Sequence, residues 1–161
     1  MGAEQLSTCL WDEQAALEEL AFRLEQELLV LKSGRHQWLA RTTAEVAVAL
    51  SRLGEIGNRR ALIARALGEE LGVTGEVTLR ALSDACAGQD EGALAGHRQR
   101  LRDALGTVQS LADRIRAILA RNITATNDAL ACMGSAPVSA YDASGTPSKS
   151  HDRALLVDAR V

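Results

Sequence analysis

The chain has 161 residues, of which 47% are hydrophobic, 2% are aromatic and 24% are charged, and its formal net charge is −3. Because Lys and Arg are interspersed with Asp and Glu, no basic face is available for phosphates, and nucleic acid is not expected as a partner. No apolar run approaches the roughly 20 residues that a membrane span needs, and the N-terminus lacks a signal-peptide pattern, so we expect a cytoplasmic protein without membrane insertion.

The apolar residues are mostly Leu, Ala, Val and Ile, which is the composition of a helical bundle. Both prolines, Pro137 and Pro147, lie in the last quarter of the chain. The first 136 residues therefore lack the strongest helix breaker. We predict an all-α fold.

An apolar stripe with leucines every seven residues predicts the first helix over about residues 10–33. Its members are Leu10, Leu17, Leu20, Ala21, Leu24, Leu28 and Leu31. Gly34 is expected to end this helix, and a second helix follows from about residue 39 to Gly72. Gly54 and Gly57 in its middle each cost about 0.5–1 kcal/mol relative to Ala, which predicts a local weakness or a close helix crossing.

A short third helix is predicted near residues 76–87, and Asp90 and Glu91 favour the start of a fourth. The fourth helix has a sustained heptad seam. The seam consists of Leu101, Leu105, Val108, Ala112, Ile115, Leu119, Asn122, Thr126, Ala129 or Leu130, and Met133. A helix of about 44 residues spans roughly 65 Å. The long helices should therefore fold back as an elongated antiparallel coiled coil or three-long-helix bundle, with the short helix at one end.

The seam turns polar near its end, where Asn122 and Thr126 occupy core positions and Asn127 lies beside them. A polar seam residue can fix the alignment of helices at some cost in stability. Alternatively, the apolar partner of this stretch is not permanently present, so the face must tolerate water. The sequence leaves both explanations open.

Residues typical of catalysis or metal binding do not group in this sequence. His36, His97 and His151 have no Cys or carboxylate at metal-ligand spacing and are expected to face solvent. The cysteines, Cys9, Cys86 and Cys132, form no Cys-x-x-Cys pair and are expected to be small, buried or half-buried residues. We expect neither an enzyme nor a cofactor or metal.

The order and spacing of these features resemble the FlgN family of flagellar export chaperones over nearly the whole chain. Two long amphipathic helices, a short one and a longest last helix containing ARNITATNDALACM precede a tail with Tyr-x-x-x-Gly. The matching residues are Leu50, Leu53, Arg59 or Arg60, and Leu62 on the second helix, Arg121, Asn122, Asn127 and Leu130 on the last, and Tyr141 and Gly145 in YDASG. The sequence departs from the family pattern at Thr43, where members often carry Lys, and in the stretch GEIGN.

The resemblance implies a cytosolic carrier. Such chaperones bind the C-terminal segments of flagellar hook-associated proteins, prevent their premature assembly and deliver them to the flagellar type III export gate. An amphipathic client helix would then lie along the late fourth helix. The expected client-binding residues are Asn122, Ile123, Thr126, Asn127, Leu130 and Met133. The resemblance also implies that Tyr141, together with Gly145, docks at the export gate.

Residues 134–161 are predicted to form a disordered tail after a helical domain of residues 1–133, because they are rich in Ser, Ala and Gly. Tyr141 is the chain's one tyrosine, and a tyrosine in such a tail is a good docking anchor with few rotamers to freeze. Alternatively, Tyr141 folds back onto the bundle or has no role. The apolar residues 155–157 form a second patch that would pair with a client or cover the chain's own groove.

Two other functions fit the same residues. The heptad seam also suits a structural coiled-coil adaptor, or a self-assembling protein without a client. A thiol-based enzyme would depend on Cys9, Cys86 or Cys132. As a chaperone, the chain is expected to be a monomer or a homodimer.

Overall fold

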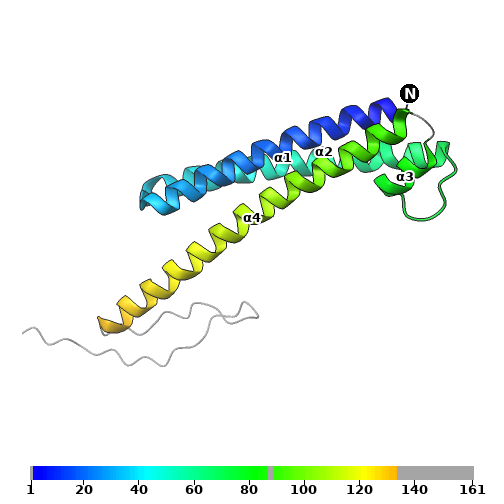
Figure 1. Ribbon diagram of the computed structural model, residues 1–161. Coiled ribbons are helices and arrows are strands. Elements are labelled where there is room, and N and C mark those ends of the chain that lie inside the picture. The colour runs from blue at the N-terminus through cyan, green and yellow to red at the C-terminus, as the bar shows by residue number, and fades with distance from the viewer. Residues whose placement is uncertain (1, 87–88, 134–161) are drawn as a thin grey trace, which may run out of the picture. The chain divides into compact units, whose positions relative to one another are not determined.

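The computed structural model describes residues 2–86 and 89–133, which form four α-helices and a 3-10 turn and include no β-strand (Figure 1). The elements are α1 Gly2–Ser33, η1 His36–Trp38, α2 Leu39–Glu70, α3 Leu79–Ala85 and α4 Gln89–Cys132. The predicted all-α fold is confirmed. The predicted tail of residues 134–161 lies outside the described residues, so its boundary with the helical domain stays a prediction.

The chain divides into two compact units, Met1–Ile118 and Leu119–Val161. Helix α4 is continuous through this division. The first unit contains α1, α2, α3 and α4 as far as Ile118. In the second unit the described residues are 119–133, the last turns of α4 and the residue after them.

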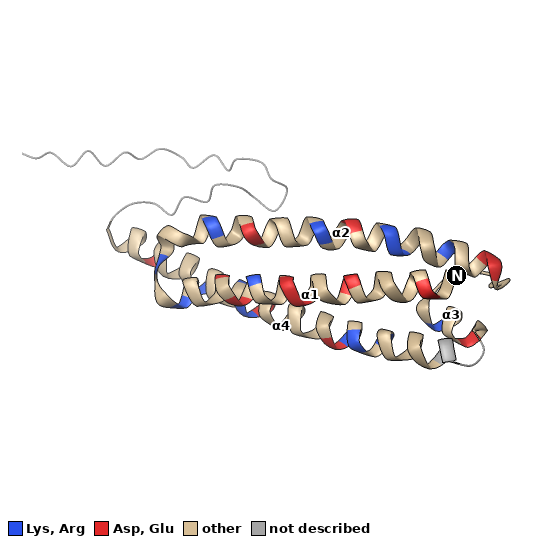
Figure 2. Cartoon of the chain, turned by 90° about the horizontal axis from the view of Figure 1, so that it is seen from above, with Lys and Arg blue, Asp and Glu red and all other residues tan. Residues whose placement is uncertain are grey.

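Within the first unit, α1 and α2 lie side by side and run antiparallel (Figures 1 and 2). Leu6 at the start of α1 shares an apolar cluster with Leu67 near the end of α2 and Leu94 near the start of α4. A second cluster joins the later part of α1 with the first half of α2 and the middle of α4. Its buried members are Leu20, Leu24, Leu28, Leu31, Val46, Ala49, Leu111 and Ile115. Helix α4 is therefore parallel to α1 and antiparallel to α2, and α3 packs at the end of the unit through Leu82.

The residues of α4 that enter this core are spaced alternately by three and four. They are Leu94, His97, Leu101, Ala104, Val108, Leu111, Ile115 and Ile118. The predicted seam was wrong at every second residue, where the core residue lies one position earlier in the sequence. Leu105 and Leu119, which were predicted for the seam, are 46% and 38% exposed. The residues three and four positions after Leu101, Ala104 and Leu105, are both apolar, so the sequence alone does not distinguish them. In the structure Ala104 is the one that packs toward α1.

Helix α1 begins at Gly2, eight residues before the predicted start at residue 10, because Leu6 and Cys9 are buried in the core. It ends at Gly34 as predicted, where a φ of 68° favours glycine. The end of α2 is a Schellman motif in which Gly72 has a φ of 68° and the N–H of Val73 donates to the carbonyl of Gly68 at 2.9 Å.

Helix α2 continues through Gly54 and Gly57, so the predicted local weakness does not break it and stays a prediction about its stability. A Cβ added at either position would meet nothing within 4 Å, so no close helix crossing occurs there. The close approach lies at Gly68, where an added Cβ would be 3.0 Å from a methyl group of Val77. The short helix α3 covers seven residues instead of the twelve predicted, and the Thr78 hydroxyl caps it by accepting from the N–H of Ala81 at 3.1 Å.

Two carboxylates of α1 are enclosed where α1 faces α2. Glu13 forms an ion pair with Arg60, with 3.1 Å between Glu13 Oε2 and Arg60 Nε. Glu27 is 8% exposed and accepts a hydrogen bond from the Thr43 hydroxyl at 2.5 Å. Burial raises the pKa of Glu13, and the charge of Arg60 opposes that increase. These pairs fix the relative alignment of α1 and α2, since a shift along either helix would leave a carboxylate without its partner.

Candidate functional site

The last turns of α4, in the second unit, carry an exposed apolar stripe. With about 100° of rotation per residue, an α-helix places residues 119, 123, 126, 130 and 133 on one narrow face. These are Leu119, Ile123, Thr126, Leu130 and Met133. We call this face the α4 stripe.

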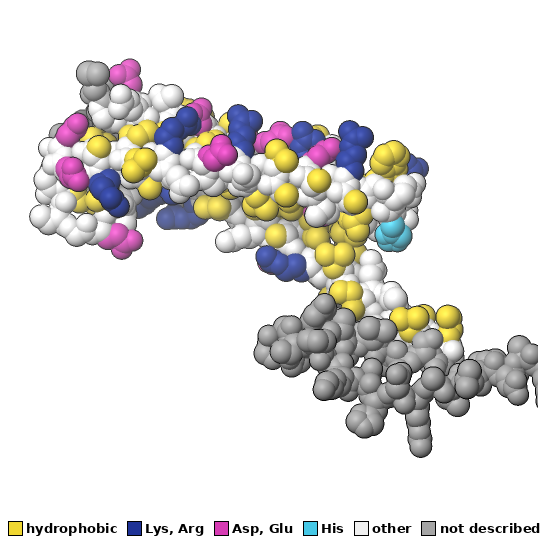
Figure 3. Space-filling model, turned by 180° about the vertical axis from the view of Figure 1, so that it is seen from behind, with side chains coloured by type: hydrophobic (Ala, Val, Ile, Leu, Met, Phe, Trp, Pro, Cys, Tyr) yellow, Lys and Arg dark blue, Asp and Glu magenta, His cyan; other side chains and the backbone are white. Residues whose placement is uncertain are grey.

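The α4 stripe is open to solvent along most of its length. Ile123 is 61% exposed and Met133 is 75% exposed, while Leu130 is half-buried. Figure 3 shows hydrophobic side chains reaching the surface of the segment that leads into the residues drawn in grey. Large exposed apolar side chains on adjacent turns are typical of a surface that another polypeptide covers.

Asparagines border the α4 stripe on both sides. Asn122 lies at one edge and Asn127 at the other, and both are exposed. The Thr126 hydroxyl in the middle of the stripe donates to the backbone carbonyl of Asn122 at 2.8 Å, so its polar group is satisfied within the helix. The resulting surface has an apolar centre and a polar rim, which is the pattern of protein-binding surfaces.

The structure brings together all six residues that the sequence predicted for client binding. Helical spacing places them within one face of less than half the circumference. They are Asn122, Ile123, Thr126, Asn127, Leu130 and Met133. The other two predicted site residues, Tyr141 and Gly145, lie outside the described residues.

One predicted surface residue is part of the core. His36 is exposed as expected, but His97 is only 3% exposed, and its Nε2 is 2.9 Å from the Ser7 Oγ. Its position three residues after Leu94 and four before Leu101 was the sequence signal that marks it as a core residue. His151 lies outside the described residues.

The cysteines follow the prediction in two of three cases. Cys9 and Cys86 are buried, whereas Cys132 is exposed at the end of α4. Across residues 2–86 and 89–133, no three His, Cys, Asp or Glu side chains come together as metal ligands.

Sequence reasoning missed an exposed apolar stripe on α1. Trp11, Phe22 and Leu29 lie on one face of this helix at helical spacing and are each at least half exposed. The guanidinium of Arg100 lies over the Trp11 ring at 4.8 Å from its centroid, and that of Arg23 lies over Phe22 at 5.5 Å. Phe22 follows Trp11 by eleven residues and Leu29 follows Phe22 by seven, so the sequence contained this pattern. It was overlooked because the more numerous leucines of the core stripe lie on the same helix.

The residues of α2 that carried the family resemblance occupy two different environments. Leu50 and Leu62 are 52% and 69% exposed, while Leu53 packs against the apolar core. Arg59 donates to Asp12 at 2.5 Å and Arg60 pairs with Glu13. The arginines therefore join α2 to α1, and the exposed leucines face outward.

Charged residues of both signs are interspersed along α1, α2 and α4, as the sequence indicated (Figure 2). None of the described helices has the length and apolar character that a membrane span requires. The large surface features are therefore apolar stripes between mixed charges, rather than a field of one sign.

A comparison with models of protein families identifies the family of this chain. The family model described as FlgN protein matches residues 1–149. The chain belongs to the FlgN family of flagellar export chaperones. The FlgN match includes the whole described helical region and extends past Tyr141 and Gly145. No curated protein and no solved structure matches the chain significantly.

Membership of the FlgN family assigns the chain a general role in flagellar assembly, as a chaperone that binds flagellar proteins for export. FlgN proteins are chaperones and are not known as enzymes.

Proposed function

We propose that this FlgN chaperone binds the C-terminal segments of flagellar hook-associated proteins, prevents their premature assembly and delivers them to the flagellar type III export gate. It acts in the cytoplasm, before its clients are exported. The client lies as an amphipathic helix along the α4 stripe. Its apolar face covers Ile123, Leu130 and Met133, and polar client groups reach Asn122 and Asn127.

The observation that supports this proposal is the contrast between two parts of one helix. In the first unit the core residues of α4, such as Leu101 and Ile115, are 6–7% exposed. In the second unit Ile123 and Met133 are 61% and 75% exposed. Covering such side chains contributes about 25 cal/mol per Å² of apolar surface, part of which offsets the ordering of the client. This also favours an absent partner over helix alignment as the reason for the polar residues Asn122 and Thr126.

Delivery requires a second contact, which we assign to the tail. Tyr141, with Gly145 four residues later, is the proposed docking site for the export gate. The separation of the two sites along the chain allows the chaperone to hold a client and contact the gate at the same time.

The experiment that tests client capture places charge on the α4 stripe. We expect Leu130→Asp combined with Met133→Asp to abolish binding of a peptide with the C-terminal sequence of a hook-associated protein from the same organism. Burial of two carboxylates under an apolar client helix has no compensating partner. Binding would be measured by calorimetric titration, and folding by circular dichroism melts of the same samples.

The matched control carries the same two charges on the opposite side of the helix. Ala125 and Cys132 are both exposed and lie away from the stripe. Ala125→Asp combined with Cys132→Asp should leave client binding unchanged. Equal loss of binding in both double variants would refute the α4 stripe as the client site, and a melting temperature that falls in the stripe variant but not in the control would show that the stripe belongs to the core.

A structural coiled-coil adaptor remains the second candidate, favoured by the heptad spacing of α4. It would associate with itself through the α4 stripe in the absence of any client. Analytical ultracentrifugation over a wide concentration range separates the two functions. A monomer or fixed dimer that binds the peptide supports the chaperone, and concentration-dependent assembly lost in the stripe variant supports the adaptor.

A further inference from the structure

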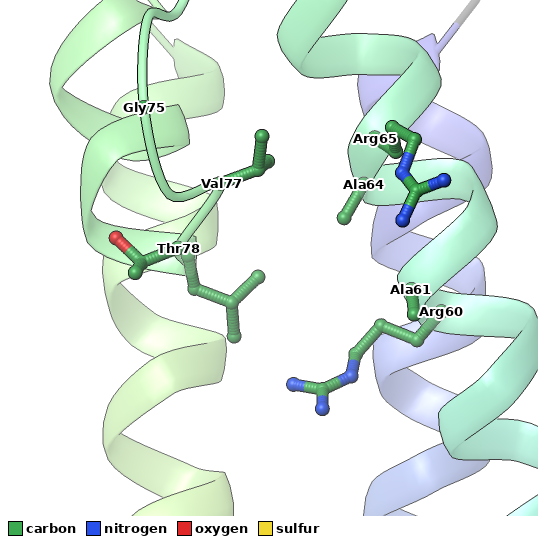
Figure 4. Close-up of a pocket in the computed structure, with 8 residues that line it drawn as sticks. Arg60, Ala61, Ala64, Arg65, Gly75, Val77 and Thr78 are labelled. Atoms are coloured by element: carbon green, nitrogen blue, oxygen red, sulfur yellow. The ribbon is translucent and has the colours of Figure 1, made fainter.

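A cavity of about 580 Å³ lies in the first unit, between α2 and the segment that connects α2 to α3. Arg60, Ala61, Ala64 and Arg65 line it from α2, and Val77 and Leu79 are among the residues that close the other side. Figure 4 shows the Arg60 side chain reaching from α2 toward the segment that carries Val77 and Thr78. We call it the Arg60/Arg65 pocket.

The charges around the Arg60/Arg65 pocket sum to one positive charge. None of the lining residues is acidic. The Nε of Arg60 forms an ion pair with Glu13. Among the described residues, no side chain accepts a hydrogen bond from Arg65 or forms an ion pair with it. Two guanidinium groups opposed by one carboxylate leave a site that matches a single negative charge better than the double charge of a phosphate.

Packing and hydrogen bonds hold the connecting segment that forms one wall of the Arg60/Arg65 pocket. Val77 packs onto the bare Cα of Gly68, where an added Cβ would be 3.0 Å from a Val77 methyl carbon. The N–H of Val73 donates to the Gly68 carbonyl at 2.9 Å, and the Thr78 side chain caps α3. A ligand would therefore not have to order this connecting segment when it binds.

Half of the pocket wall is apolar. Ala61 and Ala64 line the pocket on α2, Val77 faces them from the connecting segment (Figure 4), and Leu79 is a further lining residue. Arginine forks bind carboxylates with two parallel hydrogen bonds, and the apolar wall favours a ligand whose carboxylate is next to a hydrocarbon group.

We propose that the Arg60/Arg65 pocket binds a carboxylate joined to an apolar group on a partner polypeptide. Two sources supply this chemistry: the free C-terminus of a chain that ends in an apolar residue, or an Asp or Glu side chain beside an apolar one. The pocket is formed by the first unit alone, so the inference goes beyond the α4 stripe and does not depend on where the client helix binds.

The test uses the full chain labelled with ¹⁵N and three small probes. They are acetyl-Ala-Leu with a free carboxylate, its C-terminal amide, and acetyl-Glu-Leu amide. The readout is the concentration-dependent shift of the backbone amides of Gly75 and Val77 in NMR spectra. We expect the amide of acetyl-Ala-Leu to cause no saturating shift, and at least one carboxylate probe to cause one. A response to the free acid identifies a chain terminus as the source, and a response to the Glu probe identifies a side chain.

Arg65→Gln is the diagnostic variant, because Arg65 forms no ion pair with another residue of the described ranges. Its affinity for the responding probe should fall about tenfold, as expected for the loss of a charge-assisted hydrogen bond. The matched control is Arg52→Gln, an exposed arginine on the same helix outside the pocket, which should bind as the wild type does. Equal affinities of Arg65→Gln and Arg52→Gln, equal binding of the acid and its amide, or tighter binding of inorganic phosphate than of either carboxylate probe would each overturn the proposal.

Discussion

The Nε2 atom of His97 on α4 is 2.9 Å from the Oγ of Ser7 on α1, and this partly buried hydrogen bond joins two parallel helices. The Trp11 ring meets the imidazole edge-on, with 4.9 Å between the ring centroids. The other ring nitrogen, Nδ1, is buried and has no hydrogen-bond partner among the described residues. The structure therefore favours a neutral His97 imidazole, since a second proton on the ring would have no acceptor among the described residues.

The first prediction is a loss of stability in mild acid that depends on His97. Burial, and then the charge of Arg100, lower the pKa of His97 below its ordinary value of 6.5. The unfolded chain then binds a proton at higher pH than the folded chain does, so the free energy of unfolding decreases as the pH falls through about 6.5 toward the lowered pKa. Urea unfolding of the wild type at about pH 7.5 and about pH 5.5 measures this decrease.

His97→Gln is the comparison for this titration, because Gln can still reach Ser7 but does not change charge in this range. The variant should lose less stability than the wild type between the two pH values, whatever its absolute stability. Identical losses in the two proteins would show that other groups cause the acid sensitivity.

A second prediction concerns the ion pair between Glu13 and Arg60. The Glu13 side chain is 12% exposed, so Arg60→Ala leaves an enclosed carboxylate without its cation. We expect a loss of roughly 1–2 kcal/mol at neutral pH, less than for a fully buried pair because Arg60 is itself partly exposed. The pKa of Glu13 is already raised, so a protonated Glu13 favours folding. The loss should therefore shrink as the pH falls toward about 4.5, the ordinary Glu value.

Adding Glu13→Gln to the Arg60→Ala variant removes the unpaired charge. The double variant should recover part of the stability at neutral pH and lose the pH dependence of the single variant. Chemical unfolding at several pH values measures both effects, and a double variant no more stable than Arg60→Ala would contradict the electrostatic explanation.

A third prediction compares a residue in the observed core of α4 with a residue that only the predicted seam placed there. Ile115 is 7% exposed, whereas Leu105 is 46% exposed. Ile115→Asp should cost roughly 3 kcal/mol or more and unfold much of the bundle, while Leu105→Asp should cost less than about 1 kcal/mol. Both variants exchange an aliphatic side chain for Asp on one helix. Thermal melts that show equal damage would place Leu105 in the core after all.

The sequence predicted the long helices well because leucines every seven residues and glycines at the ends are strong local signals. Gly34 and Gly72 end helices as expected, with φ values of 68°. The start of α1 was placed too late although Leu6 lies three residues before Cys9 and four before Leu10, which is helical spacing. The stripe of leucines every seven residues begins only at Leu10, and the burial of Leu6 comes from residues far along the chain, including Leu67 and Leu94.

The candidate site also has one part that the sequence could predict and one part that it could not. The α4 stripe follows from helical spacing, so its residues could be placed on one face from the sequence. The Arg60/Arg65 pocket could not, because it depends on how the segment with Val77 folds against Gly68. The burial of His97, by contrast, was readable from its position three residues after Leu94 and four before Leu101.

The last prediction separates delivery from client capture. Tyr141→Ala should leave the melting temperature and client affinity nearly unchanged, because the composition of residues 134–161 predicts no native packing for this side chain to lose. Binding to the purified export-gate domain should weaken by on the order of 2 kcal/mol, as for a hot-spot aromatic residue, while Tyr141→Phe keeps the ring and most of the affinity. Cells that carry Tyr141→Ala should accumulate chaperone-bound clients and swim poorly. Titrations of the gate domain, with and without client peptide, measure the effect directly. Equal gate affinities of wild type and Tyr141→Ala would rule out the docking role, and a melting temperature lower by several degrees would show that Tyr141 packs on the helices instead.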